Sequence, residues 1–131
     1  MGLSRGYEPI DELLARLRSA QGPAWLEGEL RGGRLAPPEL FEKLRVGSEV
    51  PIEGLERLKE RGNELLKAPS DRDALLAGMA GYFLAVAAAL ATRGTLITSQ
   101  NPERLAPILR RLSEAAPEPW KGIFAAAANR R

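Results

Sequence analysis

The chain has 131 residues, of which 44% are hydrophobic and 27% are charged, and its formal net charge is +2. This size and balance are typical of one globular domain with its own core, and they exclude disordered and fibrous proteins. The sequence contains no cysteine and no histidine, which excludes disulfides, thiolate metal sites and every Ser-His or Cys-His nucleophile arrangement.

Three short helices are predicted at the beginning of the chain. Apolar side chains three, four and seven residues apart predict a first helix over about residues 9–20, with Pro9 at its first position. Pro23 is suited to open a second helix that carries Trp25, and the Arg-Gly-Gly-Arg segment at residues 31–34 ends it. A third short helix follows the two prolines at residues 37–38.

A longer amphipathic helix is predicted from about residue 52 to residue 67. Its leucines, among them Leu55 and Leu58, form one apolar stripe, and its charged residues occupy the opposite face. Gly62 falls on the apolar side, where glycine costs about 1 kcal/mol relative to alanine in a helix. We therefore expect the backbone of another element to come close to Gly62.

Residues 74–92 contain no charged side chain, so they fit either a membrane span or the central helix of a core. At 1.5 Å per residue this stretch is roughly 28 Å long, just enough to cross the hydrocarbon layer. Its few strongly apolar residues favour membrane insertion by only about 2 to 3.5 kcal/mol in total, because alanine contributes little. The amphipathic stripes of the other helices need a surface to cover, and this favours a central core helix.

The ends and the small residues of this apolar helix are also readable from the sequence. Ser70 with Asp73 three residues later predicts the N-terminal cap, and Gly94 predicts the C-terminal stop. Small residues four apart allow a neighbouring backbone to approach, and Gly62 is expected to face this row of Ala77, Gly81, Ala85 and Ala89.

The last part of the chain predicts a loop and two more helices. Residues 95–100 are β-prone, but no second strand is available to pair with them, so we expect an ordered loop. Asn101 and Pro102 have the residue types of a helix cap and first turn, and Pro107 should kink or delay the helix that follows. Trp120 opens the final helix.

These elements together predict an all-α fold. The expected architecture is a compact single domain over residues 1–131, a bundle of six or seven helices around the Ala-rich apolar helix at about residues 70–93. The spatial order of the helices is left open, because short helices allow several packings.

No catalytic, cofactor-binding or metal-binding residue is predicted. Asp71 and Asp73 lie at a helix start, where capping explains them, and the acidic residues of the helix at 52–67 alternate with Arg and Lys as on a solvated surface. No phosphate-binding glycine motif is present. We therefore expect a protein that is not an enzyme and uses no cofactor.

A nucleic-acid-associated protein is the main alternative function, ahead of a single-span membrane protein through residues 74–92. Residues 68–131 are more basic than the first half, and Trp120 beside them has the residue type that stacks on a base. No nucleic-acid-binding motif accompanies them, and a net charge of +2 is small. The residues of this basic face are Arg93, Arg104, Arg110, Arg111, Lys121, Arg130 and Arg131.

The favoured prediction is a non-catalytic module that binds another protein, as an adaptor, an assembly subunit or a regulator. Trp and Arg are common anchors of protein interfaces, and irregular segments on a helical scaffold often carry contacts. The N-terminal residues lack the apolar stretch of a secretory signal, so a cytoplasmic location is expected, with a homo-oligomer as one form of partnership. Whether the two tryptophans belong to the core or to an interface is left open. The candidate interface residues are Trp25, Arg31, Arg34, Arg110, Arg111, Trp120 and Lys121.

Overall fold

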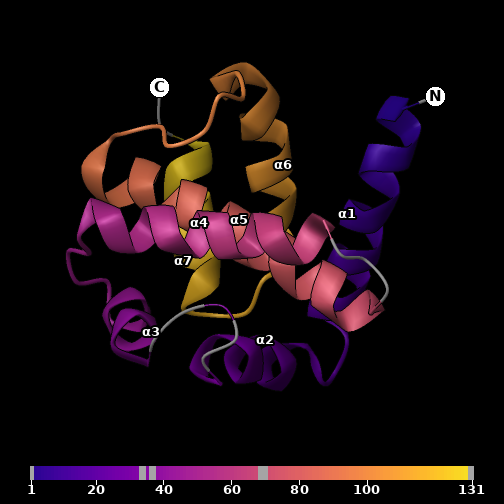
Figure 1. Ribbon diagram of the computed structural model, residues 1–131, viewed down its shortest axis with the longest axis horizontal. Helices are drawn as coiled ribbons and strands as arrows, with labels where there is room; N and C mark the ends of the chain where they lie inside the picture. Colours follow the sequence, from indigo (N-terminus) through magenta and orange to yellow (C-terminus); the bar gives the residue numbers. More distant parts are fainter. Residues whose placement is uncertain (1, 33–34, 36–37, 68–70, 130–131) are drawn as a thin grey trace.

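A computed structural model describes residues 2–32, 35, 38–67 and 71–129, with side chains from residue 10 onward. In this part of the chain there are helices and connecting loops but no strand, which confirms the all-α prediction. Figure 1 shows α4 crossing the front of the bundle, with α2 and α3 along one of its edges and α6 on the other side. The helices are α1 (Gly2–Arg18), α2 (Gly22–Arg31), α3 (Pro38–Arg45), α4 (Ile52–Lys67), α5 (Arg72–Arg93), α6 (Pro102–Ala115) and α7 (Trp120–Ala128).

Helix α5 is the centre of the bundle, as the sequence predicts. Every residue from Ala74 to Ala89 is buried, and α5 packs against α1, α2, α4 and α7. A helix that is apolar on all sides has no solvent face, so it fits where neighbours surround it. Among the described helices, α5 alone has the length and composition to cross a membrane, yet 83% of its apolar window is buried inside the bundle.

Helices α4 and α5 cross where two glycines meet. A Cβ atom on Gly62 would lie 2.6 Å from the carbonyl oxygen of Gly78 and 2.8 Å from the amide nitrogen of Tyr82. The predicted close approach at Gly62 is therefore present, but its partners differ from the row that the sequence suggested. Gly81, a member of that row, instead packs on the side chain of Leu35, because α4 meets the adjacent face of α5.

Two helix ends differ from the sequence predictions, and a third helix continues through a proline. Helix α1 begins at Gly2 rather than near residue 9, so Pro9 lies inside it. The cap of α5 is Asp71, whose side chain accepts a hydrogen bond from the amide of Asp73, whereas Ser70 lies outside the described residues. Helix α6 also runs through Pro107, which is exposed, so the carbonyl group that it leaves unbonded can face water.

The connection between α5 and α6 is an ordered loop without a strand, as predicted. The Lys59 ammonium group donates a hydrogen bond to the carbonyl oxygen of Ile97 at 2.9 Å. The hydroxyl groups of Tyr82 and Thr98 also share a hydrogen bond. These contacts attach the loop to both α4 and α5, so it is part of the scaffold.

Candidate interaction surface

Within the part of the chain that the structure describes, no group of three or more acidic residues is placed to hold a metal ion. A small cavity of about 10 Å³ lies between α1, α2, α5, α6 and α7 and has an apolar lining, including Leu13, Leu26 and Phe124. A cavity of this volume has room for about one water molecule, and without polar partners it stays dry. It does not offer a binding site.

A larger feature is an open hollow of about 630 Å³ on the surface, where α1, the start of α2 and the start of α5 meet. We call it the α1–α2–α5 hollow. Most of its lining residues come from α1 and the turn after it, and α5 contributes one carboxylate. The lining residues are Glu12, Ala15, Arg16, Ser19, Gln21, Trp25 and Asp73.

Arg16 is held between an aromatic ring and a carboxylate at the centre of the hollow. Its guanidinium carbon lies 5.1 Å from the centroid of the Trp25 ring, within the range of a cation–π contact. Its Nη1 atom donates to Oδ1 of Asp73 at 2.8 Å. Trp25, Arg16 and Asp73 thus form one stacked row across three helices.

The exposure of these charged groups is unequal. The side chain of Asp73 is 56% exposed, whereas that of Arg16 is 31% exposed because the Trp25 ring covers part of it. Trp25 itself is half-buried and packs on the core, and its indole N–H has no hydrogen-bond partner among the described residues. The carboxylate of Asp73 is therefore the charge in this row that is most open to a partner.

A second ion pair stands at the rim of the hollow. Arg72 donates from Nε to both carboxylate oxygens of Glu12, at 2.9 and 2.8 Å, and Nη2 adds a further contact. The hydrogen bond to Arg72 lowers the pKa of the Glu12 carboxyl, and the positive charges of Arg72 and Arg16 act in the same direction. Glu12 is thus held in its charged form.

Acid should weaken the attachment of α1 to α5 through this pair. Because the pKa of Glu12 is lower in the folded chain than in the unfolded chain, its contribution is complete above the usual value of 4.5 and is lost as pH falls below it. We expect the urea midpoints of wild type and Glu12→Gln to differ slightly at pH 7 and to converge toward pH 3. In an Arg72→Gln background this pH-dependent difference should become much smaller, because only the charge of Arg16 then lowers the pKa of Glu12. An unchanged difference would assign it to another group.

The predicted interface residues do not form one surface. Trp25 lies in the hollow, and the exposed side chain of Arg31 lies over the Phe41 ring at 5.0 Å. Arg34 lies outside the described residues. Trp120 is 0% exposed and belongs to the core, which corrects its place among the candidate interface residues: its ring fills the space beside Phe41, with ring centroids 5.6 Å apart.

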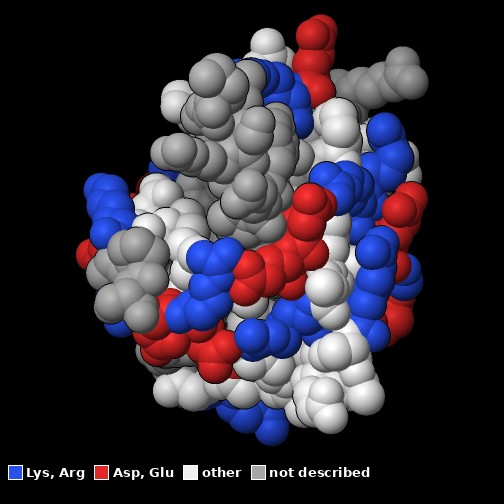
Figure 2. Space-filling view, turned by 90° about the vertical axis from the view of Figure 1, so that its right-hand side faces the viewer, with Lys and Arg blue, Asp and Glu red and all other residues white. Residues whose placement is uncertain are grey.

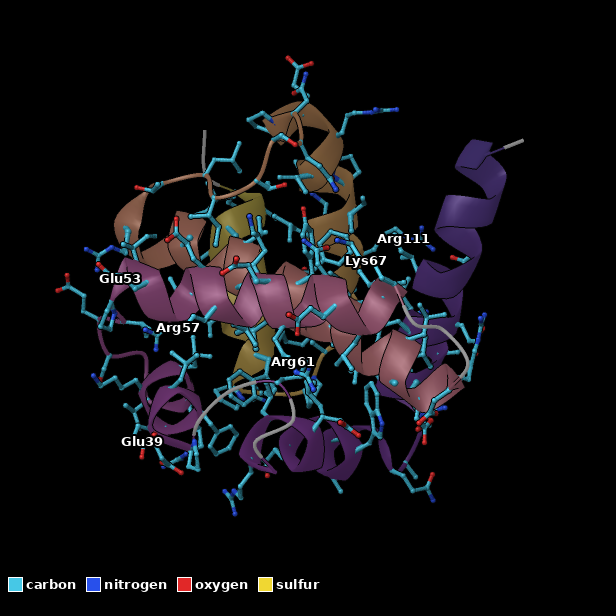
Figure 3. All side chains as sticks on the ribbon, viewed as in Figure 1. Glu39, Glu53, Arg57, Arg61, Lys67 and Arg111 are labelled. Carbon is cyan, nitrogen blue, oxygen red and sulfur yellow. The ribbon has the colours of Figure 1, made fainter. Side chains whose placement is uncertain are left out.

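Several of the predicted basic residues have acceptors of their own, and Arg130 and Arg131 lie outside the described residues. Arg111 pairs with Asp11 of α1, and Figure 3 shows it on the side of α6 that faces α1. Lys121 is half-buried and donates to the carbonyl oxygen of Ser113 at 2.7 Å, near the C-terminal end of α6. Arg110 is exposed. Arg93 pairs with Glu49 across a distance of 3.1 Å.

The face that carries α1 and the start of α5 shows charges of both signs. In Figure 2, Lys and Arg side chains alternate with Asp and Glu side chains on this face, without a continuous field of one sign. Figure 3 labels Glu53, Arg57, Arg61 and Lys67 along α4. The acidic residues Glu56, Glu60 and Glu64 stand between them in the sequence, and Glu64 pairs with Arg61. Both faces resemble a solvated protein surface more than a phosphate-binding one.

Three functional candidates of the hollow were not predicted from the sequence. The sequence predicts only a capping role for Asp73, and no local pattern singles out Glu12 or Arg16. Asp73 follows Arg16 by 57 positions in the chain, so no local pattern could join them. The only local signal was Trp25, a large aromatic residue in a short helix with few other apolar side chains.

Comparisons with known proteins do not assign this chain to a family. No family model, no curated protein and no solved structure matched it.

Proposed function

We propose that this chain is a non-catalytic protein-interaction module, an adaptor, assembly subunit or regulator, and that the α1–α2–α5 hollow is its contact surface. The observation that carries the proposal is the stacked row of Trp25, Arg16 and Asp73 in a concave surface. Trp and Arg in partly desolvated positions are the most frequent anchors of protein interfaces.

The rest of the described surface supports the choice of this hollow. Val46 is the one large hydrophobic residue of this part of the chain that is highly exposed, at 60%. A single exposed residue is ordinary on a soluble surface and does not make a patch. The hollow, in contrast, combines concavity, an aromatic wall and exposed charge in one place.

Filling the hollow should weaken binding to the partner by at least about tenfold, while an equal change elsewhere should not. Ala15 is exposed on α1 and lines the hollow, so Ala15→Arg places a long side chain inside it. Ala126 is exposed on α7, and Ala126→Arg adds the same charge and bulk outside the hollow. A tenfold loss corresponds to about 1.4 kcal/mol, which the loss of one anchor residue can cause.

The partner can be obtained by photo-crosslinking from inside the hollow. A benzophenone amino acid at Gln21, which is exposed and lines the hollow, would be irradiated in an extract of the source cells, and the crosslinked protein identified and purified. Calorimetry would then give its Kd for wild type, Ala15→Arg and Ala126→Arg. Equal Kd values for the two variants, or no crosslinked protein, would reject the hollow as the contact surface; a crosslink to a second copy would define a homo-oligomer.

A further inference from the structure

The charges that line the α1–α2–α5 hollow point to the chemistry of its partner. Its lining contains two carboxylates, Glu12 and Asp73, and one guanidinium, Arg16. Arg16 pairs with Asp73, and Arg72 at the rim pairs with Glu12. The four charges balance, so the charge that a partner meets depends on which of these groups is most exposed.

The geometry makes the negative charge the accessible one. Arg16 is covered on one side by the Trp25 ring and engaged by Asp73, which leaves its side chain 31% exposed. The carboxylate of Asp73 is 56% exposed, and among the described residues only its Oδ1 atom accepts a hydrogen bond from a side chain. The other oxygen, Oδ2, can accept from a group that enters the hollow.

The uncharged part of the lining suits the stem of a long side chain. Ala15 is small, and Trp25 supplies apolar surface beside the charged row. Lysine and arginine lay their methylene groups along apolar surface while the cation reaches an acceptor. The hollow provides both elements side by side.

We propose that the hollow receives a lysine or arginine side chain of the partner protein, with the cation on Asp73 Oδ2 and the methylene stem against Ala15 and Trp25. This inference rests on the proposed function, because it names the partner chemistry of the same surface. Glu12 at the rim is already paired with Arg72, so most of the attraction for the cation comes from Asp73. The complementary charges also predict weaker binding at higher salt.

The test uses Trp25 as the reporter of its own site. The chain has two tryptophans, so Trp120→Phe leaves Trp25 as the only one, and its fluorescence would be followed during titration with acetyl-Leu-Arg-Leu-amide. The matched probes are the same peptide with Gln or Glu in place of Arg. We expect saturable binding of the Arg peptide that is about two- to fivefold tighter than that of the Gln peptide, as an ion pair with an exposed carboxylate provides.

Two variants separate the carboxylates from the hollow as a whole. Asp73→Asn should weaken binding of the Arg peptide by about two- to fivefold and leave binding of the Gln peptide unchanged. Glu12→Gln should have a smaller effect in the same direction. If Asp73→Asn lowers helicity in far-UV circular dichroism, Glu12→Gln decides alone. Equal binding of the three peptides, preference for Glu, or no binding of the Arg peptide would overturn the inference.

The two proposals can fail separately. If Ala15→Arg weakens the natural partner but the hollow binds the Glu peptide best, the contact surface stands and its cationic occupant is wrong. If the Arg peptide binds as expected but no protein crosslinks at Gln21, the chemistry of the hollow stands and the proposed function is wrong.

Discussion

Replacing Trp120 by alanine is expected to lower the free energy of unfolding by about 3–5 kcal/mol, the range for removal of a large buried aromatic side chain. Trp120 is 0% exposed and stands at the first position of α7, with its ring 5.6 Å from that of Phe41 in α3. Its loss would leave a void between α3 and α7. The void cannot close unless one of these two helices moves. Urea unfolding followed by far-UV circular dichroism would measure the change.

The matched control is Trp120→Phe, which keeps an aromatic ring at this position. The indole N–H of Trp120 is buried and has no hydrogen-bond partner among the described residues, and an unpaired buried donor costs about 1–3 kcal/mol. Phenylalanine removes this donor but also loses volume, so the two effects oppose each other and the stability should stay within about 1 kcal/mol of wild type. A loss below about 1 kcal/mol in Trp120→Ala would show that the ring is not a core residue in solution and would return it to the candidate interface.

The roles of the two tryptophans could not be separated from the sequence. Each lies in the first turn of a short helix and has apolar neighbours at helical spacing, so the local patterns are alike. Their difference comes from long-range packing: Phe41 lies beside Trp120, whereas Arg16 lies beside Trp25 and separates it from Asp73. Contacts between residues this far apart in sequence leave no local periodicity to read.

Most of the fold, in contrast, follows from local patterns. The uncharged stretch that became α5, the cap at Asn101 and the stop at Gly94 are all where the sequence places them. The errors lie at helix ends, such as the start of α1, where Pro9 predicts the first position but the helix begins at Gly2. A proline removes one hydrogen bond, and the stability of a helix depends on the packing of its whole apolar stripe.

The candidate surface was predictable only in part for the same reason. Residue type alone indicates Trp25 as a candidate. For Asp73 the sequence predicts only a local role in capping. In the structure Asp73 does lie in the first turn of α5, yet its carboxylate pairs with Arg16, and the cap comes from Asp71. A residue that satisfies a local rule can still have a different role once the helices are packed.

The crossing of α4 and α5 gives the second large expected effect. Gly62→Ala should lower the free energy of unfolding by about 1–3 kcal/mol, although alanine favours a helix over glycine by about 1 kcal/mol. The added Cβ would lie 2.6 Å from the carbonyl oxygen of Gly78 and 2.8 Å from the amide nitrogen of Tyr82. Both are backbone atoms, so neither can rotate away, and α4 and α5 would have to move apart where they cross.

The matched control for this prediction is Gly122→Ala in α7, where a Cβ would meet nothing within 4 Å. That variant should gain about 0.5–1 kcal/mol, because only helix propensity changes. Opposite signs for the same substitution in two helices would show that Gly62 is required by the approach of the α5 backbone. Stabilisation by both variants would mean that α4 and α5 lie farther apart in solution than the close approach at Gly62 implies. The apolar side chains of α5 would then be the only evidence for its central position.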